Sequence, residues 1–276
     1  MAEVMHRCDI VLRVGCAGWA IPSQHAHAFP AQGTHLERYA QRFTGVEVNS
    51  SFYRSHRPTT YARWAASVPD PFQFAVKMPK EITHTRRLVE VTAPLECFLT
   101  EVQSLGPKLG PLLIQLPPSL HFTESLAQTF LAALRTRFQG SVVCEPRHGS
   151  WFSPAAERLL HAFQVARVAA DPARVPAAAV PGGWPGLVYY RWHGTPEMYV
   201  SACTRAAVEA LAAQVAAAAL VRSGPRAVSG GHDSIMTPAG FPDGKGAPRG
   251  EHGCTERGSP VDVRAWCAAT RRFAPP

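Results

Sequence analysis

The sequence predicts an α/β protein, and more closely a TIM-like (β/α) barrel in which seven βα units are recognisable. Three observations support this fold class. Short apolar segments alternate with segments of helical periodicity, and each apolar segment becomes polar on one face toward its carboxyl end. Of the 276 residues, 46% are hydrophobic, which is enough material for the core of one large domain.

The first half of the chain supplies four strand segments, each followed by a helical segment. Thr59 or Thr60 is expected to cap the second helix, and Pro117 ends the fourth strand. Glu124 lies in the first turn of the next helix, where a carboxylate is favoured. Strands are expected at residues 11–15, 45–52, 72–78 and 111–116, and helices at residues 35–43, 59–67, 94–105 and 123–138.

The second half supplies strands at residues 142–145, 165–170 and 187–192 and helices at residues 154–163 and 204–221. The eighth strand and helix, which would close a barrel, are missing from their place or altered. Residues 224–260 contain 9 Gly and 5 Pro, a composition typical of a loop or a disordered segment. We therefore expect a barrel domain at residues 1–223 and an atypical Gly/Pro/Arg-rich tail at residues 224–276.

Charge and cysteine content exclude several classes of protein. The 28 Lys and Arg residues outnumber the 20 Asp and Glu residues, and the net charge of +8 permits a small anionic ligand. The chain has no run of five or more basic residues, so nucleic acid is not expected as a partner. Seven cysteines without a Cys-x-x-Cys pair indicate a reducing cytoplasm. Arg13 interrupts the first apolar stretch, so no signal peptide is expected, and no apolar run reaches the ~20 residues that cross a membrane. The oligomeric state stays open.

Polar residues recur on one face of the strands at their carboxyl ends, because positions two apart in a strand point to the same side. Burying such charges singly is costly, so their recurrence predicts one shared wet pocket where barrel enzymes hold their active sites. The alternative is that the same charges form salt bridges that plug the barrel interior. The residues of this pattern are Glu47, Asn49, Lys77, Gln115, Glu145, Arg147, Asp171, Arg191 and His193.

Four of these residues are candidates for catalysis. Glu47 and Glu145 could be a general acid and base if their environments push their pKa values apart. Lys77 could stabilise an oxyanion or act as a base or Schiff-base nucleophile, and His193 could shuttle protons. Substrate-binding candidates include arginines suited to a carboxylate or phosphate and aromatic residues just past strand ends. They are Asn49, Tyr53, His84, Gln115, Arg147, Trp151, Asp171 and Arg191.

A metal site is a weaker alternative. His25 and His27 follow the first strand with the His-x-His spacing of some barrel hydrolases. A set made of Glu145, Asp171 and His193, with Glu47 as a further ligand, would suit Mg²⁺ or Mn²⁺. Because lysine and arginine in the same pocket would oppose a cation, we expect neither a metal nor another cofactor.

Six motifs occur in order along the chain. They are Gly15-Cys16-Ala17-Gly18-Trp19, Glu47-Val48-Asn49-Ser50-Ser51-Phe52-Tyr53, Phe74-Ala75-Val76-Lys77 with Ile82-Thr83-His84, Gln115-Leu116-Pro117-Pro118, Glu145-Pro146-Arg147-His148 with Trp151, and Tyr190-Arg191-Trp192-His193-Gly194. Together they resemble the motifs of the domain-of-unknown-function 72 family, also called YecE-like. The resemblance covers about residues 11–200. It implies a TIM-like barrel and no particular reaction.

One block of that family is absent. An aromatic–Asp-Asn or Asn-Asn strand would follow the last helix, where this chain reads Arg226-Ala227-Val228-Ser229-Gly230-Gly231. Our hypothesis is that the reading frame changes near Gly224, and a genuine flexible extension is the alternative.

The sequence leaves open whether the protein is an enzyme. The leading interpretation is a cytoplasmic barrel enzyme that uses acid–base chemistry on a small anionic substrate, with neither nucleic acid nor a membrane as partner. One alternative is a metal-dependent barrel hydrolase or nuclease. Another is a non-catalytic binding protein or an inactive remnant with an incomplete barrel.

Overall fold

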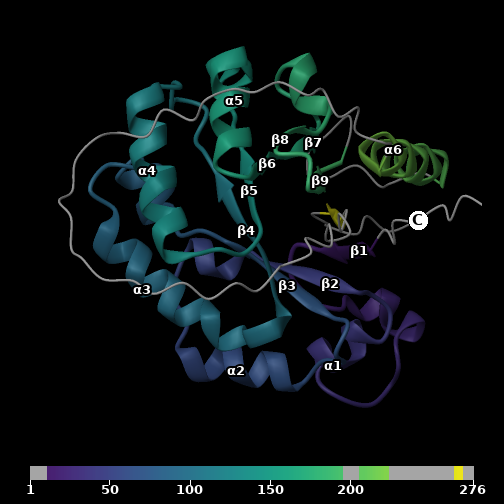
Figure 1. Ribbon diagram of the computed structural model, residues 1–276. Helices are drawn as coiled ribbons and strands as arrows, with labels where there is room; N and C mark the ends of the chain where they lie inside the picture. Colours follow the sequence, from purple (N-terminus) through teal and green to yellow (C-terminus); the bar gives the residue numbers. More distant parts are fainter. Residues whose placement is uncertain (1–10, 195–204, 224–263, 270–276) are drawn as a thin grey trace, which may run out of the picture.

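The structure, a computed structural model, describes residues 11–194, 205–223 and 264–269 and has an α/β fold with mostly parallel strands (Figure 1). Its strands are β1 (Val11–Cys16), β2 (Gly45–Val48), β3 (Gln73–Lys77), β4 (Leu109–Gln115), β5 (Val142–Glu145), β6 (Val165–Arg167), β7 (Ala169–Asp171), β8 (Gly182–Gly183), β9 (Leu187–Trp192) and β10 (Arg264–Ala269). Its α-helices are α1 (His35–Ala40), α2 (Pro58–Ala66), α3 (Thr92–Val102), α4 (Glu124–Arg137), α5 (Pro154–Ala162) and α6 (Arg205–Ser223). Short helical segments lie at η1 (Ser23–Ala28), η2 (Ser50–Phe52), η3 (Glu81–Thr85), η4 (Gln103–Lys108), η5 (Gly149–Phe152) and η6 (Pro176–Ala179).

The strands form two sheets that adjoin each other at two places. One sheet has the order β2-β3-β4-β5-β6-β8 and the other the order β1-β10-β9-β7. Every pair is parallel except β6 with β8. Only Val168 separates β6 from β7 along the chain. At the other junction, Ala17 forms a parallel bridge with Glu47, and the Gly18 N–H donates to the Glu47 carbonyl at 2.9 Å. The seven expected strand segments are all present, the sixth as the two short strands β6 and β7.

A strand stands where the eighth was expected to be missing. β10 lies parallel between β1 and β9, with Arg264 opposite both Val11 and Leu187. This corrects the expectation that the eighth strand is missing, while the stretch of loop composition at residues 224–260 falls outside the described residues. The Gly- and Pro-rich composition ends at Pro260, and residues 264–269 contain neither residue, so they can extend as a strand. The proposed change of reading frame near Gly224 and the missing helix fall outside the described residues.

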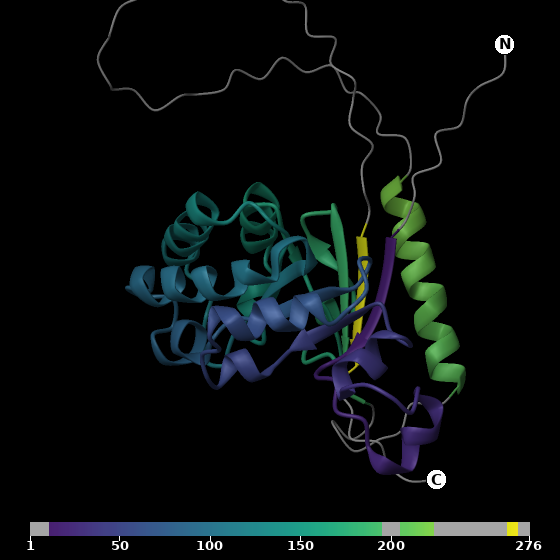
Figure 2. The same cartoon turned by 90° about the horizontal axis from the view of Figure 1, so that it is seen from below.

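The helices cover the outer faces of the sheets. Figure 2 shows α6 beside β1 and β10, on the side of the strands opposite the helices α2 to α5.

Thr34 caps α1 in a reciprocal capping box with Glu37. The expected cap of α2 at Thr59 or Thr60 is wrong. The helix begins earlier, with Arg57 as its N-cap and Pro58 in its first turn, where proline's missing N–H costs nothing. None of the described helices combines the length and the apolar character needed to cross a membrane.

Side chains of the strands take part in three apolar clusters, two of them on opposite faces of the strands and a small third one under α6. Phe74, Val76 and Leu112 belong to the cluster beneath the helices. The opposite face carries a second cluster, whose fully buried members include Leu113 and Tyr189. The strands β3 to β5 are therefore buried on both faces, as parallel strands usually are, whereas Leu12 and Val14 of β1 are 48% and 42% exposed. The second cluster consists of Ala75, Leu113, Val143, Ala166, Val168, Leu187 and Tyr189.

A close approach of β1 to β2 depends on glycine. A Cβ atom on Gly15 would lie 2.0 Å from the carbonyl oxygen of Gly45, far inside van der Waals contact. The Tyr39 hydroxyl bonds both strands, since it donates to the Gly45 carbonyl at 3.1 Å and accepts from the Cys16 N–H at 2.7 Å. The glycine in the first motif is therefore a packing requirement of this junction.

Candidate functional site

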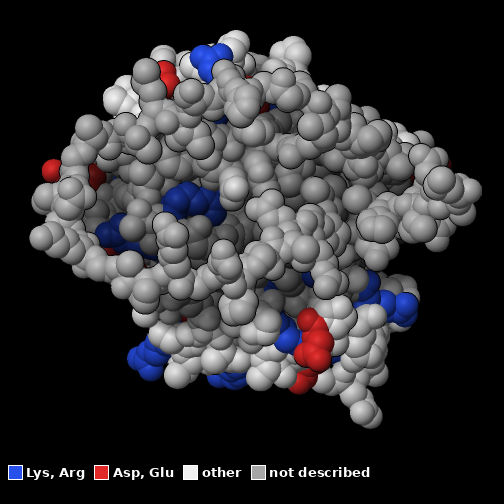
Figure 3. Space-filling model, in the orientation of Figure 1, with Lys and Arg blue, Asp and Glu red and all other residues white. Residues whose placement is uncertain are grey.

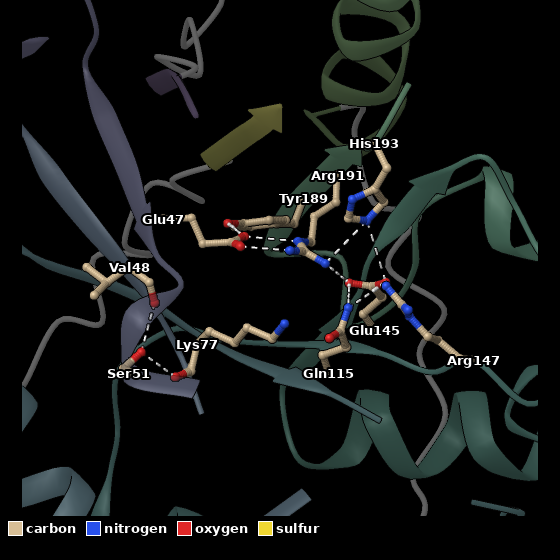
Figure 4. A network of polar contacts seen from close by, with 10 residues as sticks. All are labelled: Glu47, Val48, Ser51, Lys77, Gln115, Glu145, Arg147, Tyr189, Arg191 and His193. Atoms are coloured by element: carbon tan, nitrogen blue, oxygen red, sulfur yellow. Dashed lines mark hydrogen bonds and ion pairs between the residues drawn. The ribbon is translucent and has the colours of Figure 1, made fainter. Parts of the chain in front are cut away.

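The candidate site lies directly above the second apolar cluster, at the carboxyl ends of the strands. On β3, β4, β5 and β9 the side chain two residues beyond a cluster member is polar. The four pairs are Ala75 and Lys77, Leu113 and Gln115, Val143 and Glu145, and Tyr189 and Arg191. Lys77, Gln115 and Glu145 are each the last residue of their strand. The alternation expected from the sequence thus places polar groups together, and Figure 4 shows them converging.

Arg191 and Glu47 form one half of the network. The Arg191 Nη2 and Nε atoms donate to the two carboxylate oxygens of Glu47 at 2.7 and 3.0 Å. The Tyr189 hydroxyl donates to the same carboxylate at 3.1 Å. The side chains of Arg191 and Glu47 are 1% and 0% exposed, so this bidentate pair is shielded from water.

Arg191 and Glu145 form the other half. Arg191 Nη1 donates to Glu145 Oε2. Gln115, the cross-strand neighbour of Glu145, places its Nε2 atom 3.2 Å from both carboxylate oxygens. Arg147 Nε donates to Glu145 Oε1 at 3.1 Å, and Arg147 Nη2 lies 3.0 Å from the same atom. The carboxylate of Glu145 therefore faces two guanidinium groups.

These contacts determine the charge of the two central groups. Burial acts to raise the pKa of Glu145, but Arg191, His193 and Arg147 together hold that pKa well below its ordinary value. Burial acts to lower the pKa of Arg191, and Glu145 and Glu47 outweigh it and raise that pKa. Glu145 is therefore ionised across the neutral range, which suits a structural counter-ion and not a general acid.

Lys77 differs from the other charged groups of the network. The residue is 7% exposed and forms no ion pair with any residue that the structure describes. Its Nζ atom lies 4.1 Å from the centre of the Phe52 ring, and its side chain extends toward Gln115 and Arg191 (Figure 4). Burial lowers the pKa of Lys77 to about 8, and the charge of Arg191 acts in the same direction against Glu47 and Glu145.

His84 and Arg147 stand at the edge of the network, near Lys77. His84 is partly buried in η3, its ring centre 4.9 Å from that of Phe52, with Nδ1 2.8 Å from the Thr83 hydroxyl. Burial lowers the pKa of His84, and the cations Lys77 and Arg147 lower it further. The side chain of Arg147 is 19% exposed, and its Nη1 atom has no partner among the described residues. These groups are the part of the site that faces outward.

His193 completes the group from the end of β9. Its Nε2 atom is 3.8 Å from Glu145 Oε1 and 3.4 Å from Arg191 Nη1, and the residue is 2% exposed. Its backbone N–H donates to the Asp171 carbonyl at 2.7 Å. The structure thus brings together seven of the predicted residues in direct contact or close by, namely Glu47, Lys77, Gln115, Glu145, Arg147, Arg191 and His193, and places His84 beside them.

Four predicted residues are not brought into this network. Trp151 is 3% exposed and packs in the core beneath the helices, where its Nε1–H donates to the Leu120 carbonyl at 2.9 Å. Tyr53 is 72% exposed. Asp171 ends β7 and lines a cavity under α6. Asn49 follows β2, and its Oδ1 atom is buried without a hydrogen-bond partner among the described residues.

Three residues outside the predicted site set also shape the site. Tyr189 lies two positions before Arg191 on the same strand face, and the alternation places it there without indicating that its hydroxyl binds Glu47. Phe52 contacts Lys77 but reads in the sequence as an ordinary apolar residue. The Ser51 hydroxyl lies 2.7 Å from the Lys77 carbonyl and 2.8 Å from the Val48 carbonyl, a link between β2 and β3 that no spacing indicates.

The described residues do not provide a set of ligands for the weaker metal hypothesis. His25 and His27 lie in η1, and no group of three or more His, Cys, Asp or Glu side chains that could hold a metal occurs within the described ranges. Two cavities of about 260 Å³ each border the network, one between η2, η3 and α3 that is lined in part by Ser51 and Phe52, and one under α6 that is lined in part by Arg191. Figure 3 shows Lys and Arg side chains on the face turned to the viewer, where a negative ligand would meet favourable charge.

Comparison with known proteins identifies relatives of this chain. Residues 13–229 match the model of a family described as "Protein of unknown function DUF72". The UPF0759 protein YecE of Escherichia coli strain K12 is 34% identical over 151 residues, which are 52% of this chain and 55% of that protein. The UPF0759 protein YunF of Bacillus subtilis strain 168 is 30% identical over 157 residues, 52% and 53% of the two chains. The match thus spans about half the length of these curated relatives.

Two crystal structures are similar in fold. A DUF72 family protein from Thermotoga maritima MSB8 aligns with a TM-score of 0.65 and 18% identity over 94% of this chain and 92% of that one. A DUF72 family protein from Enterococcus faecalis V583 aligns with a TM-score of 0.64 and 17% identity over 94% and 89%. At these identities the likeness concerns the fold alone.

Proposed function

The chain belongs to the DUF72 family, and from the site built by its described residues we propose that it is an enzyme acting on a small organic anion. Lys77 would transfer a proton to or from this substrate, and Arg147 would bind the substrate's negative group. The reaction class is acid–base chemistry at the carboxyl ends of the strands.

One observation carries this proposal. The site contains the buried cations Lys77 and Arg191, the partly buried cation Arg147, and two buried carboxylates, and Lys77 makes no ion pair within the part of the chain that the structure describes. A buried charge without a partner is unfavourable and is stabilised by a ligand of opposite charge. A small anion would compensate Lys77.

The contacts support a different role for each of the three cations. Arg191 uses Nε, Nη1 and Nη2 on Glu47 and Glu145, so little of its donor capacity remains for a substrate. Arg147 keeps its Nη1 atom without a partner among the described residues and is partly exposed, so it can bind an anion from outside. Lys77 lies deeper, where a bound anion would cover it.

Proton transfer fits Lys77 better than either glutamate. A general acid or base works best when its pKa lies near the working pH, and the pKa of Lys77, lowered by burial and by Arg191, is about 8. Glu145, held ionised by its neighbours, would instead fix the positions of Arg191 and Arg147. His84, whose pKa is lowered by burial and by Lys77, would exchange protons between Lys77 and solvent. His193 would position Glu145 from the far side.

We also propose that the two sheets close into a TIM-like barrel. The Ala17–Glu47 bridge at one junction and the single residue Val168 at the other support this, as does the small apolar cluster on the inner face. In such a barrel β10 would be the eighth strand, so the barrel domain would extend past residue 223. A cytoplasmic location is consistent with Cys97 and Cys144, which form no disulfide.

A ligand screen tests the proposed function. We expect at least one small carboxylate or phosphate compound to raise the melting temperature of the protein, because a ligand that binds the folded state stabilises it. The effect should be lost in Lys77→Met and strongly weakened in Arg147→Ala. Lys80→Met is the matched control, since Lys80 is exposed three residues further along and should leave the effect intact.

Proton transfer is measured on the ligands that the screen identifies. In deuterated water, wild-type protein should speed exchange of the hydrogen next to the ligand's carbonyl or carboxylate, and Lys77→Met should not. If no anion stabilises the protein, or if Lys77→Met responds as the wild type does, the network is a structural plug of ion pairs and the proposal is wrong.

A further inference from the structure

Lys77 is unlike the other lysines that the structure describes. Lys80 is exposed, and Lys108 donates to the Val68 carbonyl at 2.5 Å and lies 3.5 Å from the Asp70 carboxylate. Lys77 is buried, has an aromatic ring beside its Nζ atom, and lacks any carboxylate partner within the described residues. Its amine is therefore not held by an ion pair within the described residues and is available for a bond to a ligand.

We propose that Lys77 forms an imine with the carbonyl carbon of a small 2-oxo acid whose carboxylate is bound by Arg147. This inference rests on the proposed function and deepens it, because it names the substrate class and makes Lys77 a nucleophile as well as a proton carrier. A lysine desolvated beside cationic groups is the arrangement that activates an amine toward carbonyl compounds.

The surroundings of Lys77 favour the uncharged amine. Burial and the neighbouring Arg191 lower its pKa to about 8, so roughly one tenth of the side chains are uncharged at pH 7. An exposed lysine of ordinary pKa has a neutral fraction smaller by more than about a hundredfold at the same pH. Lys77 is thus expected to react with carbonyl compounds at neutral pH far more readily than an exposed lysine of ordinary pKa.

The neighbouring residues select a carbonyl compound with an adjacent anionic group. Arg147 offers Nη1 as a free donor, while Glu145 fixes its Nε and Nη2 atoms. Arg147 follows β5 and Lys77 ends β3, and these strands flank β4 on either side. Neighbouring strands lie about 4.8 Å apart, so a short molecule can contact both long side chains across the end of β4.

The chemistry balances without a further reactant. The lone pair of the neutral Nζ atom attacks the carbonyl carbon, a C–N bond forms, and the carbonyl π electrons move to oxygen, which takes up a proton. Loss of the Nζ proton and departure of the hydroxyl group as water then give the C=N bond. His84, close to both Lys77 and Arg147, can deliver and accept these protons. The protonated imine draws electrons from the neighbouring carbon, which eases removal of a proton from it.

Reductive trapping tests this directly. The full-length protein is incubated at pH 7 with pyruvate and sodium cyanoborohydride, digested and analysed by mass spectrometry. We expect the peptide with Lys77 to gain the mass of pyruvate less one oxygen atom, well before Lys80 does. Lys77→Arg, which keeps the charge but cannot form the imine, should give no adduct at this position.

A second variant separates carboxylate binding from reactivity. Arg147→Ala should slow trapping of pyruvate by about tenfold or more, the loss expected for a charge-assisted contact, yet leave trapping of the uncharged ketone acetone unchanged. The inference is overturned if Lys77 is labelled no faster than Lys80 by pyruvate, 2-oxobutyrate and oxaloacetate. If in that case anions still stabilise the wild type but not Lys77→Met, the imine is wrong and the proposed function stands. If anions do not stabilise the wild type either, the proposed function is wrong as well.

Discussion

The ammonium group of Lys77 lies 4.1 Å from the centre of the Phe52 ring, on the edge of a network whose two carboxylates are both bound by Arg191. The ring face offers a partial negative charge to a cation that has no carboxylate of its own among the described residues. This contact links the motif after β2 to the motif at the end of β3. We therefore expect the ring to favour the protonated form of Lys77.

Replacing the ring should change the pKa of Lys77. Phe52→Leu removes the cation–π contact but keeps an apolar side chain, so the pKa of Lys77, already lowered to about 8 by burial and by Arg191, should fall by a further 0.5 to 1, roughly. Competitive acetylation of Lys77 across pH, read by mass spectrometry, measures this. Tyr53→Leu is the control, because its ring is 72% exposed and forms no cation–π contact with Lys77 in the described part of the chain. An unchanged midpoint in Phe52→Leu would show that the ring has no influence.

Lys77→Met should alter how stability depends on pH. Because the folded pKa of Lys77, lowered by burial and by Arg191, is about 8 and the unfolded value is 10.5, the unfolded chain binds more protons between these values. The free energy of unfolding of the wild type should therefore rise relative to Lys77→Met from pH 8 to pH 10.5, by at most ~3 kcal/mol. Chemical denaturation of both proteins gives the difference. A constant difference over this range would contradict the lowered pKa.

Removing Arg191 should destabilise the fold strongly. Arg191→Met leaves the buried carboxylates of Glu47 and Glu145 without their main counter-charge, and we expect a loss of about 3–5 kcal/mol in the free energy of unfolding. Arg86→Met is the comparison, since the side chains of Arg86 and its partner Glu81 are 43% and 54% exposed. That variant should lose less than about 1 kcal/mol. Equal losses in both variants would mean that burial of the Arg191 ion pairs does not increase their contribution to stability.

Acid should weaken the contribution of Glu145 to the free energy of unfolding. The pKa of this carboxyl, which burial acts to raise, is held well below 4.5 by Arg191, His193 and Arg147, so the unfolded chain takes up its proton first as the pH falls. The stabilisation of the fold by the ionised Glu145 carboxylate is complete above about pH 5, and it is lost as the pH falls below that value toward the folded pKa. Denaturation between pH 5 and pH 3 should show a shallower slope for Glu145→Gln than for the wild type. Parallel slopes would place the acid sensitivity elsewhere.

Gly15→Ala should separate β1 from β2. The added Cβ would lie 2.0 Å from the Gly45 carbonyl oxygen, a backbone atom that cannot move away alone, so several kcal/mol of stability should be lost, about as much as for severe overpacking. Gly149→Ala is the matched control, because its nearest neighbour would be a Val175 methyl group at 4.0 Å. Thermal denaturation of both variants is sufficient. Similar melting temperatures would rule out a rigid junction.

The strands and their polar ends could be predicted from the sequence because both depend on local patterns. Alternation placed Lys77, Gln115 and Glu145 on one face, and parallel neighbours then bring such residues together at one edge. β10 could not be predicted in the same way. Its six residues follow a long Gly- and Pro-rich stretch, and they form a strand by pairing with two partners that lie far back in the sequence.

Individual roles were harder to predict than location. Nothing local indicates that Arg191 binds both glutamates while Lys77 stays without an ion pair in the described network, since this depends on distances across the sheet. Trp151 follows the Glu145 motif closely, yet η5 turns its ring into the core. A residue's position just past a strand end is therefore weaker information than the strand face to which it belongs.

The pairing of β10 with β1 and β9 joins residues as far apart in sequence as Val11 and Arg264. A ribosome releases the amino-terminal strand long before the strand that will lie beside it. During that interval the nascent chain carries β1 and β9 with unpaired edges, open to wrong partners. Such distant pairing is intrinsically slow. During synthesis in the cell, the chain would thus be most prone to wrong pairing, and most dependent on chaperones, before β10 has been made.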